Sequence, residues 1–278
     1  MHAVDAAMRT QPLKNPLNLL RCCESIQWML FVTGKPAMTN LATYSRSGSV
    51  GTIVMDDGKA NVMSLGMLNA LHAAFDQAER DKTVPILKAR GKHFSGGFDL
   101  NVFTHGNAQD QYLMVKAGAE LALRILSFPT PVVAACHGNA FPMGAFLIMS
   151  CDHRIAAEGN YRIGMNEVAI GLTVPRFAIE IARQRLTPAY FSRVVMTAEM
   201  FAPLEAVTAG FFDRVVPASE LEHAAEEAAR ALSTLNMAAH AATKARARGA
   251  VIKMIRAMID EDITPQYGEN RVASRASA

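Results

Sequence analysis

The chain has 278 residues, of which 50% are hydrophobic and 19% are charged. This composition excludes a disordered chain and supports a sizeable core, in one large domain or two small ones. The formal net charge is only +3, so nucleic acid is not an expected partner. No run approaches the roughly 18 consecutive apolar residues of a membrane span, so we expect no membrane partner.

The cysteines indicate a reducing compartment. They lack the spacing of a zinc site or of a Cys-x-x-Cys motif, and they stand at Cys22, Cys23, Cys136 and Cys151. We therefore expect free thiols in a cytoplasmic protein, or in the mitochondrial matrix if the source is eukaryotic.

Residues 1–37 form an N-terminal extension whose role the sequence leaves open. A short apolar run, IQWMLFV, loosely resembles a signal segment, but no clear small-residue cleavage site follows it. An organelle leader and an over-extended reading frame before Met38 are the other two interpretations. No function is assigned to this extension.

Strands and helices alternate from residue 41 onward. A hairpin is expected first, with Val50–Met55 as its apolar strand. Ser64 is a suitable N-cap for a helix that ends near Asp81, because apolar residues follow it at helical spacing. Further strands are expected over residues 84–89, 131–136, 153–158 and 213–216.

The intervening segments predict helices that join parallel strands by right-handed crossovers. These helices are expected over residues 111–126, 145–151 and 203–209. Further helices are expected after the third loop, up to about residue 197. From Ser219 onward the sequence predicts helix throughout, and its last stretch has no strand left to cover. It must pack on the domain or on another subunit. We therefore divide the chain into residues 1–37, a core over 38–218 and a helical region over 219–278.

The first candidate loop is Phe94–Leu100, with the sequence FSGGFDL. The glycine pair Gly96 and Gly97 lets backbone N–H groups turn toward one point, and the positive end of the following helix favours an anionic oxygen there. A glycine pair in a tight turn is by itself more often structural. Asp99 alone is best interpreted as a helix N-cap.

The second loop, residues 137–145, carries Gly138 and Gly144 and also leads into a helix. It is placed to supply a second N–H group to the same oxygen. Two converging helix starts of this kind suggest an oxyanion hole.

The third loop carries Glu167 among apolar residues. Burial among such neighbours raises the pKa of a carboxyl and makes it a usable proton carrier. The alternative is a structural acid that is paired with one of three arginines, Arg154, Arg162 or Arg176. No His-x-x-x-His or HExxH pattern is present, so no metal site is expected.

At these three loops the sequence resembles the crotonase superfamily, which includes enoyl-CoA hydratases and isomerases. HFSGGFDL is similar to the family's FSAGAD-like motif, and NEVAIGL is similar to its PEV-x-LGL motif. GNAFPMGAFLIMSCDHRIAAE and APLEAVTAGFFDRVVP are similar to two further family motifs, and the resemblance covers about residues 45–258.

The resemblance implies an α/β spiral of ββα units with a C-terminal helical trimerisation region. It also implies a homotrimer or a dimer of trimers. The implied substrate is an acyl-CoA thioester, with no metal or redox cofactor, because coenzyme A is part of the substrate. By the same resemblance, the N–H groups of Phe98 and Met143 form the oxyanion hole and Glu167 is the catalytic acid/base. Contacts to the substrate are implied for Lys59, Ala60, Gly96, Gly97, Asp99, Gly144 and Phe146.

Two departures from the family pattern affect the predicted reaction. Phe146 occupies the position where hydratases carry one of their two glutamates. Mitochondrial-type enoyl-CoA isomerases, which the sequence resembles here, also keep one glutamate and have an apolar residue at this position. Met143 stands where glycine is usual, and its side chain restricts the backbone angles. We expect Gly144 to absorb the resulting strain.

The sequence therefore favours migration of a double bond, from beta,gamma-enoyl-CoA to alpha,beta-enoyl-CoA. One glutamate suffices for this reaction in a dry pocket, whereas hydration uses a base for the water and an acid for the alpha carbon. An enoyl-CoA hydratase, or another crotonase reaction in fatty-acid metabolism, is the first alternative. A catalytically weak acyl-CoA-binding protein is the second.

Overall fold

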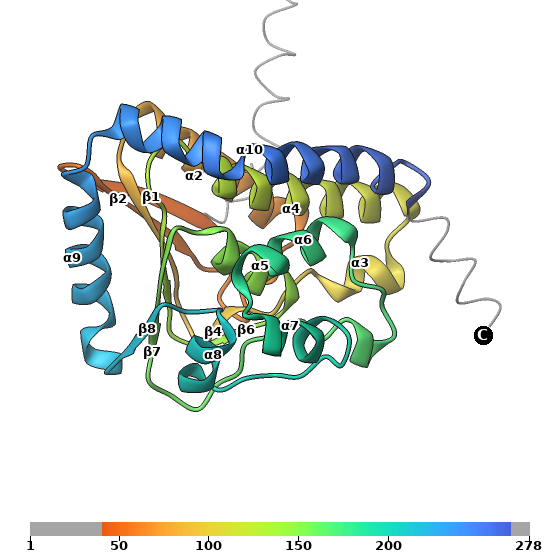
Figure 1. The fold of residues 1–278 in the computed structure, drawn as a ribbon. Helices are drawn as coiled ribbons and strands as arrows, with labels where there is room; N and C mark the ends of the chain where they lie inside the picture. The colour runs from red at the N-terminus through yellow and green to blue at the C-terminus, as the bar shows by residue number, and fades with distance from the viewer. Residues whose placement is uncertain (1–40, 268–278) are drawn as a thin grey trace, which may run out of the picture. The chain divides into compact units, whose positions relative to one another are not determined.

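The computed structural model describes residues 41–267, which all belong to one unit of the chain. A six-stranded sheet with the order β1-β2-β3-β5-β7-β8 lies at its centre (Figure 1). β1 and β2 form the expected antiparallel hairpin, and the other neighbours pair in parallel, which confirms the α/β class. The strands of this sheet are β1 (Ala42–Ser47), β2 (Val50–Met55), β3 (Val84–Ala89), β5 (Val133–Cys136), β7 (His153–Ala157) and β8 (Arg214–Val216).

Side chains alternate between the two faces of the sheet, as strand geometry requires. On one face, Ile53 and Leu87 join the main core together with three helices, α2 (Leu65–Arg80), α4 (Ala108–Ser127) and α5 (Pro142–Ser150). On the other face, Ile86 and Val133 pack under helix α9 (Leu221–Ser233) (Figure 1). The first of the predicted C-terminal helices thus covers the sheet itself.

The helices follow the expected positions closely. Ser64 caps α2 (Leu65–Arg80), because its Oγ accepts the Met67 N–H at 3.2 Å. Among the described residues, no helix is long and apolar enough to cross a membrane. The other helices are α3 (Leu100–His105), α4 (Ala108–Ser127), α5 (Pro142–Ser150), α6 (Arg176–Arg185), α7 (Pro188–Val195), α8 (Pro203–Ala209), α9 (Leu221–Ser233) and α10 (Met237–Asp262).

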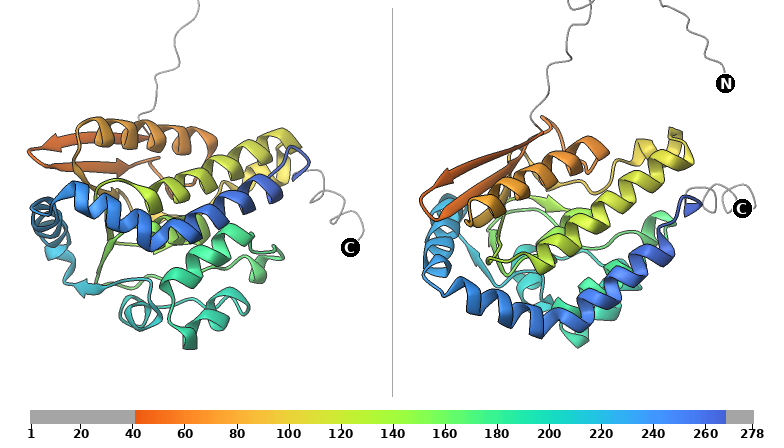
Figure 2. Two further views of the ribbon diagram at one scale, coloured as in Figure 1. Left: turned by 45° about the horizontal axis from the view of Figure 1, so that its top comes forward. Right: turned by 90° about the horizontal axis from the view of Figure 1, so that it is seen from above.

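The long helix α10 packs across α4 and α6 (Figure 2). A partly buried ion-pair cluster anchors it, in which Asp152 accepts from Lys244 Nζ at 2.6 Å and from Arg248 at 2.9 Å. At the end of the helix, Asp262 accepts from Arg176 Nε at 2.7 Å. These contacts fix the C-terminal segment that leads to Tyr267.

Candidate active site

A second, two-stranded sheet joins the first two candidate loops. It pairs β4 (His93–Ser95) in parallel with β6 (Asn139–Ala140), with Ser95 opposite Ala140. Phe98 and Met143 each lie three residues beyond that pair. Because the two strands run in the same direction, the structure brings both predicted N–H groups to the same end of this small sheet.

The backbone before Phe98 is held by bonds on both sides. The Gly97 N–H donates to Ser95 Oγ at 3.1 Å, and the Gly97 carbonyl accepts the Met63 N–H at 2.8 Å. Gly97 has a φ of 88°, which favours glycine because it carries no Cβ. Within residues 41–267, the Phe98 N–H donates to no backbone carbonyl.

Met143 is the second residue of α5, directly after Pro142. The first N–H groups of a helix have no acceptor inside it, and they carry the positive end of the helix dipole. In the described part of the chain, the Met143 N–H also donates to no backbone carbonyl. Met143 therefore presents its N–H group at the end of a helix, as an oxyanion hole requires.

Glu167 lies within the third loop, directly before a 3-10 turn, η1 (Val168–Ile170). Its carbonyl accepts the Leu172 N–H at 2.8 Å, and Gly171, with a φ of 75°, closes the turn. The residue is only 6% exposed. The sequence places it among apolar neighbours, and the structure buries it there.

The three arginines considered as partners of Glu167 have other partners. Arg154 pairs with Asp213, and Arg176 pairs with Asp262 and Glu261. Arg162 donates to the Tyr161 carbonyl at 3.3 Å. Through these contacts the three arginines hold parts of the fold together.

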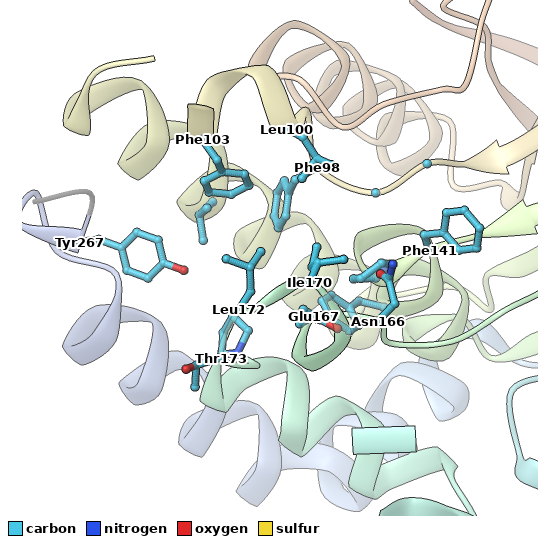
Figure 3. Close-up of a pocket in the computed structure, with 16 residues that line it drawn as sticks. Phe98, Leu100, Phe103, Phe141, Asn166, Glu167, Ile170, Leu172, Thr173 and Tyr267 are labelled. Carbon is cyan, nitrogen blue, oxygen red and sulfur yellow. The ribbon is translucent and has the colours of Figure 1, made fainter. Parts of the chain in front are cut away.

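Glu167 lines a cavity of about 160 Å³ (Figure 3). Glu167 and Asn166 lie toward one end of it, and Tyr267 lies at the other (Figure 3). Among the described residues that line the cavity, Glu167 is the only one with a carboxyl group. The lining residues are Gly96, Gly97, Phe98, Leu100, Phe103, Val115, Phe141, Pro142, Phe146, Asn166, Glu167, Ile170, Leu172, Thr173, Pro175 and Tyr267.

The structure brings only some of the predicted site residues to this cavity. Gly96, Gly97, Phe98, Phe146 and Glu167 line it, whereas Lys59, Ala60, Asp99, Met143 and Gly144 are not among its lining residues. The side chain of Met143 is fully buried. A Cβ on Gly144 would lie 2.7 Å from Ser95 Cβ, so Gly144 permits close packing of α5 on β4.

The residues predicted to contact coenzyme A lie beside the first loop. The Ala60 carbonyl accepts the Gly96 N–H at 2.8 Å, and Lys59 is exposed next to it. Asp57 shapes this turn by accepting the N–H groups of Lys59, Asn61 and Val62. Burial acts to raise the pKa of Asp57, but these backbone donors outweigh it and hold that pKa below its ordinary value of 3.8.

Asp99 is the N-cap of α3, as the sequence predicts. Its carboxylate accepts the Asn101 N–H at 3.0 Å. Asp99 therefore fixes the start of the helix whose residues Leu100 and Phe103 form one wall of the cavity.

Tyr267 is a cavity residue that sequence reasoning missed. It follows α10 and is far from the three loops in sequence, so no motif or spacing connects it with them. Asn166 belongs to the motif NEVAIGL, but nothing in the sequence indicated a role for its amide. Only the packing of α10 on α6 brings Tyr267 to this site.

The described cysteines and potential metal ligands offer no competing site. Cys136 and Cys151 are free and buried, and burial raises the pKa of each thiol to about 12, so both stay protonated. Within residues 41–267, no three His, Cys, Asp or Glu side chains are grouped so as to hold a metal ion. Cys22, Cys23 and the predicted extension 1–37 lie outside the described residues.

Comparisons with known proteins agree with this arrangement. The family model described as enoyl-CoA hydratase/isomerase matches residues 45–268. A solved structure of a probable enoyl-CoA hydratase from Mycobacterium tuberculosis is 45% identical, with a TM-score of 0.77, and the match covers 79% of this chain and 93% of that one. An apo structure of the same protein, named there an enoyl-CoA isomerase, is 44% identical to this chain, with a TM-score of 0.76 and coverage of 80% and 96%.

A curated relative, a probable enoyl-CoA hydratase of Bacillus subtilis, is 38% identical over 133 residues. That match covers 46% of this chain and spans half the length of the relative. The family model matches most of the chain, and the solved relatives share its fold. The chain therefore belongs to the enoyl-CoA hydratase/isomerase family, within the crotonase superfamily.

Proposed function

We propose that this protein moves the double bond of a beta,gamma-enoyl-CoA to the alpha,beta position, with Glu167 as the proton shuttle. One observation carries the proposal. Glu167 is the only carboxyl-bearing residue among the described residues that line the cavity, and Phe146 lines the same cavity. A single acid/base in an apolar pocket suits a reaction that returns the proton it removes.

The N–H groups of Phe98 and Met143 bind the thioester oxygen. Both stand at one end of the β4–β6 pair, and the Met143 N–H adds the positive end of α5. Negative charge develops on this oxygen as the alpha proton leaves. Fixed donors at that position stabilise the enolate more strongly than the starting thioester.

The Glu167 carboxylate takes the proton from the alpha carbon, and the C–H electron pair moves into the enolate. The extended enolate then takes the same proton from the Glu167 carboxyl at its gamma carbon. The electron pair returns from oxygen to re-form the carbonyl, which leaves the double bond between the alpha and beta carbons. No electrons are gained or lost overall, so the proposed reaction needs no cofactor beyond the coenzyme A of the substrate.

Phe146 keeps water from competing with this transfer. It is 1% exposed, and its ring meets the ring of Phe177 edge to face, with the centroids 6.0 Å apart. A hydratase has a carboxyl group at this position, by the resemblance stated above. The ring supplies no second acid and fills the place where a water would be activated.

Hydration of alpha,beta-enoyl-CoA is the second candidate function. The relative from Mycobacterium tuberculosis is named a probable enoyl-CoA hydratase in one structure and an enoyl-CoA isomerase in the other, so its two names cover both reactions. The cavity also contains the polar side chains of Asn166 and Thr173, which have the groups needed to hydrogen-bond a water molecule. In this reaction, Glu167 would act with such a water instead of with the gamma carbon.

A paired assay distinguishes these functions. The purified protein is given a 3-enoyl-CoA and a 2-enoyl-CoA of equal chain length, and formation of the 2-enoyl and the 3-hydroxyacyl products is measured. Isomerisation faster than hydration supports the proposal. Hydration without isomerisation supports the second candidate, and binding without turnover indicates an acyl-CoA-binding protein.

A further inference from the structure

Gly118 is a buried glycine in the middle of α4. Glycine is less favourable than alanine inside a helix, because it loses more backbone freedom on folding. An alanine would suit the helix better unless a neighbouring group occupies the space of its methyl group. The structure shows two such neighbours.

A Cβ at Gly118 would lie 2.7 Å from Cε1 and Cζ of the Phe98 ring and 3.3 Å from Met143 Sδ. The first distance is too short for any Cβ contact, and the second is tight. The two neighbours are the residues whose N–H groups form the proposed oxyanion hole. Both of their side chains therefore rest on the same point of α4.

This contact also explains how Met143 is accommodated where the family usually has glycine. A side chain at this position needs room that a glycine does not need. The Met143 side chain is fully buried, and its sulfur lies against the space that Gly118 leaves open. The absence of a side chain at Gly118 thus makes room for the side chain at Met143.

We propose that Gly118 is a positioning residue that sets the two oxyanion N–H groups through the side chains of Phe98 and Met143. The inference rests on the proposed function. The Phe98 ring meets the Phe103 ring edge to face, with centroids 6.2 Å apart, and its remaining free side is the cavity itself. A displaced ring therefore either carries its own loop with it or enters the space of the substrate. A methyl group at Gly118 would push both loops and move both N–H groups away from one shared oxygen.

The test is Gly118→Ala, with Gly249→Ala as the matched control. Gly249 lies inside α10, and its added Cβ would meet no atom within 4 Å. Small displacements of catalytic groups cost up to about 100-fold in rate. We expect Gly118→Ala to lower kcat by about 10- to 100-fold with a smaller change in KM, and Gly249→Ala to keep the turnover of the unmodified protein.

A second substitution tests whether the contact itself is responsible. Leucine has no atoms at the Cε1 and Cζ positions of Phe98, but it keeps the backbone N–H. Phe98→Leu combined with Gly118→Ala should therefore have a kcat close to that of Phe98→Leu alone, as a double-mutant cycle for a direct contact requires. If Gly118→Ala alone does not fold, the comparison of the double variant with Phe98→Leu still tests the contact.

Binding of a conjugated dienoyl-CoA gives a readout that needs no turnover. Its absorption moves to longer wavelength when N–H donors polarise the thioester carbonyl. We expect the full shift in the unmodified protein and a weaker shift in Gly118→Ala. The double variant should show the same shift as Phe98→Leu alone. A full shift and full turnover in Gly118→Ala would overturn the inference, as would a loss that Phe98→Leu does not relieve. A normal shift without isomerisation in the unmodified protein would instead overturn only the proposed reaction.

Discussion

The Phe141 N–H donates to the Ser95 carbonyl at 3.0 Å, and this bond fastens together the two loops of the proposed oxyanion hole. The Ser95 hydroxyl strengthens the same junction. It donates to the Asn61 carbonyl at 2.8 Å and accepts the Gly97 N–H at 3.1 Å. Ser95 thus connects the turn that carries the proposed CoA contacts with the loop that carries Phe98.

Ser95→Ala removes both bonds of the hydroxyl and leaves the Asn61 carbonyl and the Gly97 N–H without this partner. Ser95 is fully buried, so each lost partner costs about 1–3 kcal/mol. We expect a lower Tm in thermal unfolding and a kcat reduced about tenfold, because the Phe98 N–H shifts. Ser127→Ala is the control, since Ser127 is an exposed residue at the end of α4 whose hydroxyl donates only to carbonyls of its own helix. An unchanged Tm and kcat in Ser95→Ala would contradict this role.

Phe146→Glu returns a second carboxyl to the position where hydratases carry one. We expect the ratio of hydration to isomerisation to rise, because the new group admits and activates water. The Tm should fall, since a carboxyl replaces a buried ring. Phe146→Leu, which adds no acid, should not raise the ratio. The same paired assay measures both products, and a ratio that Phe146→Glu leaves unchanged would argue against the water-excluding role.

Lys59 is proposed to bind a phosphate group of coenzyme A. Its side chain is exposed on a turn that Asp57 holds rigid through three backbone N–H groups. Lys59→Ala should weaken binding of the CoA thioester and reduce its dependence on salt, because one charge contact is lost. Lys253→Ala, on the exposed side of α10, should change neither. Calorimetric titration at two salt concentrations checks this, and equal affinity across salt in Lys59→Ala would remove Lys59 from the site.

The supersecondary structure followed from the sequence, whereas the long-range contacts did not. The strand 84–89 and the Ser64 cap were predictable because local periodicity and capping chemistry determine them. Strands β4 and β6 have three and two residues, too few to show any periodicity. Their pairing, which aligns the two loops, depends on residues far apart in the chain.

In the candidate site, too, the residues with a local sequence motif were predictable and those brought in by long-range packing were not. Glu167 and the glycine loops carry local motifs, so they could be identified without the structure. The contact of Gly118 with the side chains of Phe98 and Met143 could not, because a single glycine in a helix has no pattern. Tyr267 reaches the cavity only because α10 packs back across α6.

We propose that the protein assembles as a homotrimer or a dimer of trimers through the segment of residues 219–278. In its described part, Leu235, between α9 and α10, and Met254, in α10, are 48% and 39% exposed. Val168 and Ile170, beside Glu167, are each 46% exposed and offer further apolar surface to a second copy. Assembly would remove this surface from water. Light scattering should give the mass of three or six chains, and a stable monomer at micromolar concentration would contradict the proposal.

In the proposed mechanism Glu167 alone moves the proton, and Glu167→Gln removes this function. Glutamine keeps the shape of the side chain but does not carry the proton, and Glu158→Gln serves as an exposed control. General acid/base groups contribute about 100- to 10,000-fold to the rate. The measurement is the kcat for conversion of 3-enoyl-CoA to 2-enoyl-CoA, together with the Kd of the CoA thioester. We predict that Glu167→Gln lowers kcat by at least about 100-fold while the Kd is retained, whereas full isomerase turnover by this variant would contradict the mechanism.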